Sequence, residues 1–205
     1  MKFEINVKTN LLNYKFKILF FLLLLLFFLQ ILNKFFMNKK KKFPQNKLLR
    51  NKIPNILFKT GPFNINEIPL EIKKSVYKSS KLLNCTVVYF NNQQCRNFIK
   101  YNFSKRILEA YDLLIPTAFK SDLWRYCVLY HYGGIYGDLT QTVLQKIDND
   151  IFQYDLVLVK DRANCNLDTN IQISFMASKP KQNFLKFIIN QITLKILGRD
   201  KGQCR

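Results

Sequence analysis

The chain has 205 residues, 48% of them hydrophobic, which is enough for one domain with a buried core and excludes a chain that is disordered throughout. It carries 33 Lys and Arg against 13 Asp and Glu, a formal net charge of +20. About half of this excess lies in the first 52 residues, where 12 basic residues accompany Glu4 as the one acid, so the charge flanks one segment and does not by itself indicate a nucleic-acid-binding protein.

The first segment in chain order is strongly apolar, since residues 18–32 read ILFFLLLLLFFLQIL. A membrane-spanning helix needs about 20 apolar residues, so the run is short, and a cleaved signal peptide is the alternative. No small-residue cleavage site follows it, and we therefore favour an uncleaved transmembrane signal-anchor at 18–32. An N-terminal tail at 1–17 precedes it, and a basic stem or linker at 33–52 follows.

A single domain is expected from residue 53 to residue 205. Short β-branched or aromatic runs predict strands, and longer runs with apolar residues three or four apart predict helices. The predicted strands are 53–58, 85–90, 135–138, 155–160 and 171–177. The predicted helices are 69–83, 93–100, 105–113, 116–132 and 180–197. This alternation is typical of an α/β sandwich with a mostly parallel sheet flanked by helices.

One stretch, residues 120–141, differs in character from the rest and reads KSDLWRYCVLYHYGGIYGDLTQ. Asp122 and Arg125 are three residues apart on the predicted helix and share a face, which alone indicates no more than an intrahelical ion pair. The Gly-Gly pair that follows ends the helix and permits the chain to reverse into a strand. That strand ends at Asp138, at the sheet edge where open α/β sheets bind ligands.

If the alternation of the strand continues, Thr140 shares the face of Asp138, and both could line one pocket with Asp122 and Arg125. Such a set suits a nucleotide-sugar. A carboxylate binds a hard divalent cation that bridges the diphosphate. An Asp/Arg pair holds sugar hydroxyls through charge-assisted hydrogen bonds.

These residues resemble the sugar-binding region of the DxD glycosyltransferases, which include initiation-specific α-1,6-mannosyltransferases and related capsular-polysaccharide and viral transferases. The family pattern is Asp, a hydrophobic residue, a variable residue, Arg-Tyr, an apolar helix, Gly-Gly-Ile/Val-Tyr, a variable residue and Asp-x-Asp. The chain supplies it at Asp122, Arg125, Tyr126, Gly133, Gly134, Ile135, Tyr136 and Asp138. A weaker likeness extends over residues 53–189.

The resemblance implies a GT-A fold, a GDP- or UDP-hexose donor, a divalent cation (Mn or Mg), retention of anomeric configuration, and a glycan, lipid or protein acceptor. It implies the catalytic residues Asp138, Asp122 and Arg125. The substrate-binding residues it implies are Asp122, Arg125, Tyr136, Gly134, Phe58 and Thr60, and the metal ligands are Asp138 and Thr140. A hexosyltransferase of this kind, with mannosyltransferases among its relatives, is the enzyme we expect.

The chain departs from the family pattern at three points. Thr140 replaces the second acid, and Phe63 stands where a Trp often follows the first strand. The sequence also stops at Arg205, short of the segment that completes the acceptor side, so a fragment, a minimal form and a degenerate form all stay open.

Two further function classes are alternatives: a sugar-nucleotide-binding relative without turnover, and a basic membrane-surface or nucleic-acid-binding protein. No base-stacking motif is found, so no nucleic-acid partner is expected. The membrane anchor and the family's type II members favour the Golgi or secretory pathway with a luminal catalytic domain. The Lys run at 39–42, read by the positive-inside rule, would instead place the domain in the cytosol.

Overall fold

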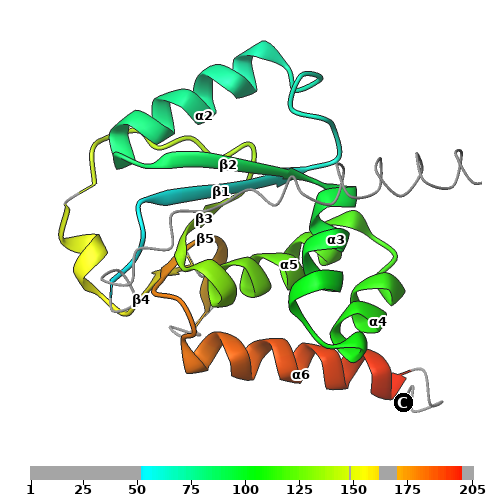
Figure 1. The fold of residues 1–205 in the computed structure, drawn as a ribbon. Coiled ribbons are helices and arrows are strands. Elements are labelled where there is room, and N and C mark those ends of the chain that lie inside the picture. Colours follow the sequence, from blue (N-terminus) through cyan, green and yellow to red (C-terminus); the bar gives the residue numbers. More distant parts are fainter. Residues whose placement is uncertain (1–51, 148, 162–169, 200–205) are drawn as a thin grey trace, which may run out of the picture. The chain divides into compact units, whose positions relative to one another are not determined.

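The computed structural model describes residues 52–147, 149–161 and 170–199, and its centre is a five-stranded sheet with the order β2-β1-β3-β5-β4 (Figure 1). The strands are β1 (Ile56–Gly61), β2 (Thr86–Asn91), β3 (Gly134–Gly137), β4 (Leu156–Lys160) and β5 (Ile171–Ser178). The helices are α2 (Leu70–Leu83), α3 (Asn92–Asn102), α4 (Lys105–Leu113), α5 (Thr117–Tyr132) and α6 (Asn183–Arg199), with a short 3-10 helix, η2 (Asn149–Gln153).

The predicted tail, the signal-anchor at 18–32 and the stem up to residue 51 lie outside the described residues. Among the helices of the described ranges, none is both long and apolar enough to cross a membrane.

The sheet is mixed, which confirms an α/β fold and corrects the prediction of a mostly parallel sheet. β1 pairs in parallel with β2 and with β3, whereas β5 is antiparallel to β3 and to β4. A parallel connection needs a crossover of a dozen or more residues, usually a helix. The ten residues between β4 and β5 are too few for such a crossover, so the spacing of these two strands requires that they pair antiparallel.

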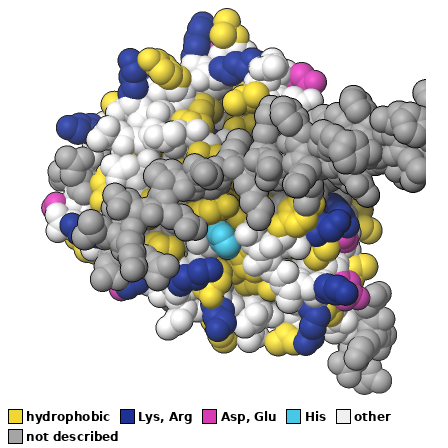
Figure 2. All heavy atoms as spheres, in the orientation of Figure 1, with side chains coloured by type: hydrophobic (Ala, Val, Ile, Leu, Met, Phe, Trp, Pro, Cys, Tyr) yellow, Lys and Arg dark blue, Asp and Glu magenta, His cyan; other side chains and the backbone are white. Residues whose placement is uncertain are grey.

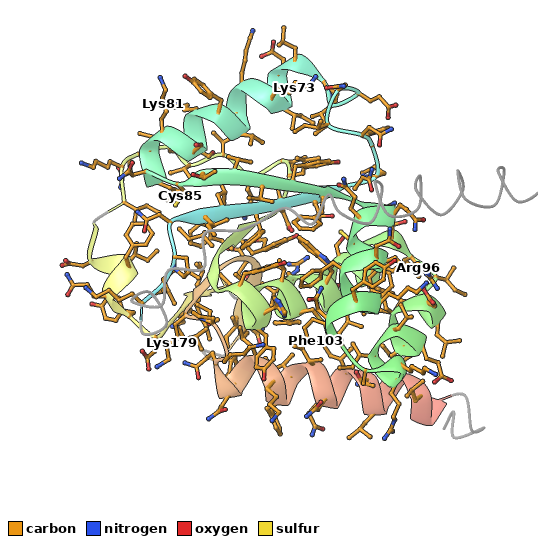
Figure 3. All side chains as sticks on the ribbon, in the orientation of Figure 1. Lys73, Lys81, Cys85, Arg96, Phe103 and Lys179 are labelled. Carbon is orange, nitrogen blue, oxygen red and sulfur yellow. The ribbon has the colours of Figure 1, made fainter. Side chains whose placement is uncertain are left out.

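The helices lie unequally on the two faces of the sheet, with α2 on one face and α3, α4, α5 and α6 on the other (Figure 1). Side chains fill the space between the sheet and both helical layers (Figure 3). On the α5 side the core is aromatic, since the ring of Trp124 packs against those of Phe90, Phe98 and Tyr136. On the α2 side it is aliphatic, with Leu57 and Ile135 among its buried members.

Local signals set the helix ends that surround the site. Asn91 caps α3 in a capping box, accepting from the backbone N–H of Gln94 while the Gln94 side chain accepts from the Asn91 N–H. Pro116 stands just before α5, where its fixed φ suits the start of a helix. Gly133 ends α5 at a φ of 68°, a conformation that side chains other than glycine rarely adopt.

Candidate active site

The reversal from α5 into β3 brings two distant parts of the sequence motif together. Arg125 lies eight residues before Gly133, about 12 Å back along a helix with 1.5 Å rise per residue. Asp138 lies four residues after Gly134, about 13 Å along a strand. Because the two paths have nearly the same length and run in opposite directions, the carboxyl end of β3 returns to the level of Arg125.

Arg125 is the centre of the resulting cluster and is almost completely buried. Its Nη2 donates to Oδ1 of Asp122 at 2.6 Å and lies 3.4 Å from Oδ1 of Asp138. Its Nη1 donates to the carbonyl of Ile173 on β5 at 2.6 Å, and its guanidinium lies 4.7 Å from the ring centroid of Tyr136. One cation, held by three elements, is therefore shared between the two carboxylates.

Asp138 is fixed through both its side chain and its backbone. The hydroxyl of the buried Tyr136 donates to Oδ1 of Asp138 at 2.6 Å, and the Asp138 N–H donates to the carbonyl of Ser174 at 2.9 Å. Its side chain nevertheless keeps 38% of its surface exposed, against 34% for Asp122 and 5% for Arg125. The two carboxylates are therefore accessible to solvent, while the buried Arg125 contacts both of them from the protein interior.

The electrostatics of the cluster agree with this division. Burial raises the pKa of Asp122, and the negative charge of Asp138 raises it further, whereas Arg125 lowers it. Burial is also the main reason that the pKa of Tyr136 is raised, so its hydroxyl stays protonated and can donate to Asp138 at neutral pH.

The structure brings together four of the predicted site residues, Asp122, Arg125, Tyr136 and Asp138. Gly134 lies at the opposite end of β3, about 13 Å from Asp138. There a Cβ would lie 2.8 Å from the carbonyl oxygen of Ile56, so this glycine permits β1 and β3 to approach closely.

Phe58 and Thr60, the predicted substrate-binding residues of β1, are buried in internal packing. The Phe58 ring stacks on that of Tyr132, and the Thr60 hydroxyl donates to the carbonyl of Phe90. Both side chains are buried, so neither presents a surface that a substrate could contact.

Thr140 does not share the face of Asp138 through strand alternation, because β3 ends at Gly137. Residues 138–141 form a turn in which the N–H of Gln141 donates to the carbonyl of Asp138 at 3.0 Å. Thr140 is exposed in this turn, so its hydroxyl is near Asp138 in sequence but is not held on the cluster by an ordered strand.

Lys59 of β1 is a residue that the sequence reasoning missed. Its Nζ donates to the carbonyl of Asp138 at 2.7 Å and to that of Gln141 at 3.2 Å. Burial lowers its pKa to about 8, and the nearby Asp138 partly opposes that change. The available signal was a single Lys inside the apolar strand ILFKT, since a charge in a buried strand requires partners.

The residues present fit a divalent cation only in part. The described residues contain no group of three or more His, Cys, Asp or Glu side chains placed to hold a metal. Mg²⁺, however, is usually held by one or two carboxylates together with the phosphates of a substrate. Asp138 can supply one carboxylate, so the site fits a cation that arrives with a diphosphate.

Comparison with known proteins indicates similarity to glycosyltransferases. Residues 70–158 match the model of the glycosyltransferase sugar-binding region containing a DXD motif. The resemblance predicted from the motif is thus confirmed. A protein of Acanthamoeba polyphaga mimivirus described as an uncharacterized glycosyltransferase is 28% identical over 144 residues, which is 70% of this chain. The match spans 57% of that relative's length.

The segment that matches this model contains the whole α5–β3 reversal and hence Asp122, Arg125 and Asp138. Two of their supports lie outside it. Lys59 precedes the matched segment, and Ile173, whose carbonyl accepts from Arg125, follows it. The cluster in the matched segment is therefore completed by β1 and β5.

Proposed function

We propose that the chain is a glycosyltransferase that moves a hexose from a nucleotide-sugar donor, a GDP- or UDP-hexose, to a hydroxyl of a glycan, lipid or protein acceptor. The observation that carries the proposal is the pairing of Arg125 with both Asp122 and Asp138 at the carboxyl edge of β3, inside the sugar-binding region. The mixed α/β sheet is compatible with the GT-A fold expected for such an enzyme.

Asp122 and Arg125 orient the hexose in this proposal. The carboxylate of Asp122 is about one-third exposed and accepts hydrogen bonds from sugar hydroxyls, while Arg125 fixes the direction in which it points. Positioning of this kind lowers the entropic part of the barrier. The acceptor hydroxyl attacks on the side that the leaving group vacates, which retains the anomeric configuration.

Charge accounting favours a divalent cation at Asp138. The two carboxylates of the cluster are balanced by Arg125 and Lys59, so these four groups supply no net positive charge for a diphosphate. Bound there, Mn or Mg would neutralise charge on the departing nucleoside diphosphate. The residues that would hold it are Asp138 and, through its hydroxyl, Thr140.

A panel of nucleotide-sugars, assayed for hydrolysis and transfer with Mn, with Mg and with a chelator, tests this function. We expect turnover of at least one donor, and a loss of about 100-fold in Asp138→Asn, because charge stabilisation at the leaving group contributes on this scale. Asp155→Asn is the matched control, since Asp155 pairs with Lys179 on the surface at 2.6 Å. Unchanged turnover in Asp138→Asn would rule out the proposed role.

Thr140 supports a second candidate, a relative that binds the donor without turning it over. Its hydroxyl replaces a carboxylate and is exposed in a turn, which weakens the cation site. If this is the natural state, the protein binds donor with Mn but releases no nucleoside diphosphate, and Thr140→Asp gains turnover. Leu144→Asp, which adds the same charge on the neighbouring loop, should gain none.

We also propose that residues 18–32 anchor the protein in a membrane of the secretory pathway, with the catalytic domain in the lumen. The apolar composition of that segment supports the anchor. Protease digestion of sealed vesicles distinguishes the topologies: a luminal domain stays intact until detergent is added, whereas a cytosolic domain is digested at once.

A further inference from the structure

Lys59 occupies a position where a charged residue is costly. It lies in β1 with 2% of its surface exposed, and Lys is almost never fully buried unless its ammonium is paired. The register of β1 with β3 pairs Phe58 with Tyr136, so Lys59 lies beside Gly137, one residue before the turn that carries Asp138.

The ammonium joins the two ends of that turn. Asp138 and Gln141 are its first and last residues, and the carbonyls of both accept hydrogen bonds from Nζ of Lys59. These contacts link positions 79 and 82 residues apart in sequence. Arg125 and Tyr136 fix the Asp138 side chain, so Lys59 adds an independent constraint on its backbone.

Gly137 leaves the space that the ammonium fills. A Cβ at this position would lie 3.2 Å from Nζ of Lys59 and 3.8 Å from Oε1 of Gln141. That Oε1 is buried and has no hydrogen-bond partner in the described part of the chain, while the amide nitrogen of Gln141 donates to the Ser174 hydroxyl at 2.7 Å. Hydrogen bonds therefore hold the turn to β1 through Lys59 and to β5 through Ser174.

We propose that Lys59 is a positioning residue for the reaction: it holds the backbone of the 138–141 turn so that the Asp138 carboxylate meets the donor diphosphate. The effect of Lys59 on the reaction rests on the proposed function. The constraint that Lys59 places on the turn does not. Lys59 reaches the site through backbone carbonyls, so it acts without touching the donor.

Hydrogen exchange of the full chain tests the constraint directly. In Lys59→Met the amide of Gln141, which donates to Asp138, should exchange at least ten-fold faster than in the wild type, while the amides of α3 keep their protection. Lys78→Met, the same change at an exposed site on α2, should leave both unchanged. Gly137→Ala, which retains Lys59 but crowds its ammonium, should act in the same direction and serves if Lys59→Met does not fold.

Steady-state kinetics test whether Lys59 affects the reaction. Since a small misplacement of a catalytic group can cost about 100-fold in rate, we expect kcat for donor hydrolysis to fall by about 10- to 100-fold in folded Lys59→Met, with the donor KM changed much less.

The outcomes separate the two proposals. Unchanged exchange at Gln141 in a folded variant, or wild-type kcat in Lys59→Met, overturns the role of Lys59 and leaves the proposed function intact. Faster exchange confined to the turn, in a protein that turns over no donor, supports the constraint and removes the proposed function.

Discussion

Arg125 is a buried cation between two partly exposed carboxylates, and this arrangement makes it the residue on which the cluster depends. A buried charge without partners is costly, and removing one member of a buried pair typically costs more than the pair itself contributes. Here the loss would leave Asp122 and Asp138 without the cation between them; burial already raises the pKa of Asp122, the charge of Asp138 raises it further, and Arg125 opposes both effects.

Arg125→Met should therefore lower the free energy of unfolding by about 2–5 kcal/mol, as measured by urea titration at pH 7. Arg96→Met is a matched control because Arg96 also bonds an Asp, Asp112, at 2.6 Å, but on the surface with 40% of its side chain exposed. That change should lower the free energy of unfolding much less than Arg125→Met does, because solvent screens an exposed ion pair. Equal losses in the two variants would show that Arg125 does not hold a buried charge cluster.

At the scale of elements, the reversal from α5 to β3 determines where the acids meet. Gly133 and Gly134 have φ values of 68° and 103°, and a Cβ on either would lie within 3 Å of a neighbouring backbone or proline atom. Both the backbone conformation and the close approach require glycine. The reversal then sets how far β3 returns along α5.

Gly134→Ala should destabilise the protein by about 2–3 kcal/mol, because the strained φ and the contact with the Ile56 carbonyl act together. It should also weaken donor binding, since β3 leads directly into Asp138. Gly198→Ala is the control: nothing lies within 4 Å of its Cβ position on α6, and alanine there should be neutral or stabilise the helix by up to about 1 kcal/mol. Thermal unfolding of both variants measures the difference, and a Gly134→Ala variant as stable as the wild type would contradict this account of the reversal.

The elements were largely predictable because their signals are local. The helix predicted at 105–113 agrees with α4, and the cap at Asn91 marks the start of α3. The first strand was predicted at 53–58 but runs from Ile56 to Gly61, because its limits follow from pairing with β2, which no local pattern reveals. The Asp122, Arg125 and Asp138 cluster could be predicted for the same local reason, a helix and a strand joined by two glycines.

What the sequence could not reveal depends on contacts between distant segments. The hydrogen bond from Lys59 to Asp138 joins β1 to a turn 79 residues later in the chain. The hydrogen bond from Arg125 to the carbonyl of Ile173 joins α5 to β5. The pairing of β5 with β3, which are not consecutive strands of the chain, belongs to the same class. The predicted position of Thr140 was wrong for another reason. The prediction continued the alternation of a strand through Thr140, whereas β3 ends at Gly137.

At the scale of the molecule, Figure 2 shows the Lys and Arg side chains of the described residues scattered over the face in view rather than gathered in one patch. The strongest global response to pH below neutrality should come from His131. Its ring packs edge-on against those of Phe98 and Tyr132, and burial, together with the charge of Lys181, lowers its pKa to about 4.

Protonation of His131 favours the unfolded chain. Between pH 6.5 and about 4 the unfolded chain binds a proton at His131 that the folded chain does not, so folding stability is lost as pH falls through this window. Because the ring is only half-buried, we expect a loss of about 1–2 kcal/mol. His131→Phe should remove it, so the gap between variant and wild type in urea unfolding should widen from pH 7 to pH 4.5. Parallel stability curves would contradict the assignment.

The most direct test of the central claim, that Asp122 and Asp138 act on one donor as a single unit around Arg125, is a double-mutant cycle in donor hydrolysis. Groups that act as a unit give non-additive losses. We predict that Asp122→Asn and Asp138→Asn each lower kcat/KM by at least ten-fold, and that the double variant loses little more than the worse single variant. Losses that multiply, or turnover that neither substitution changes, would contradict the account.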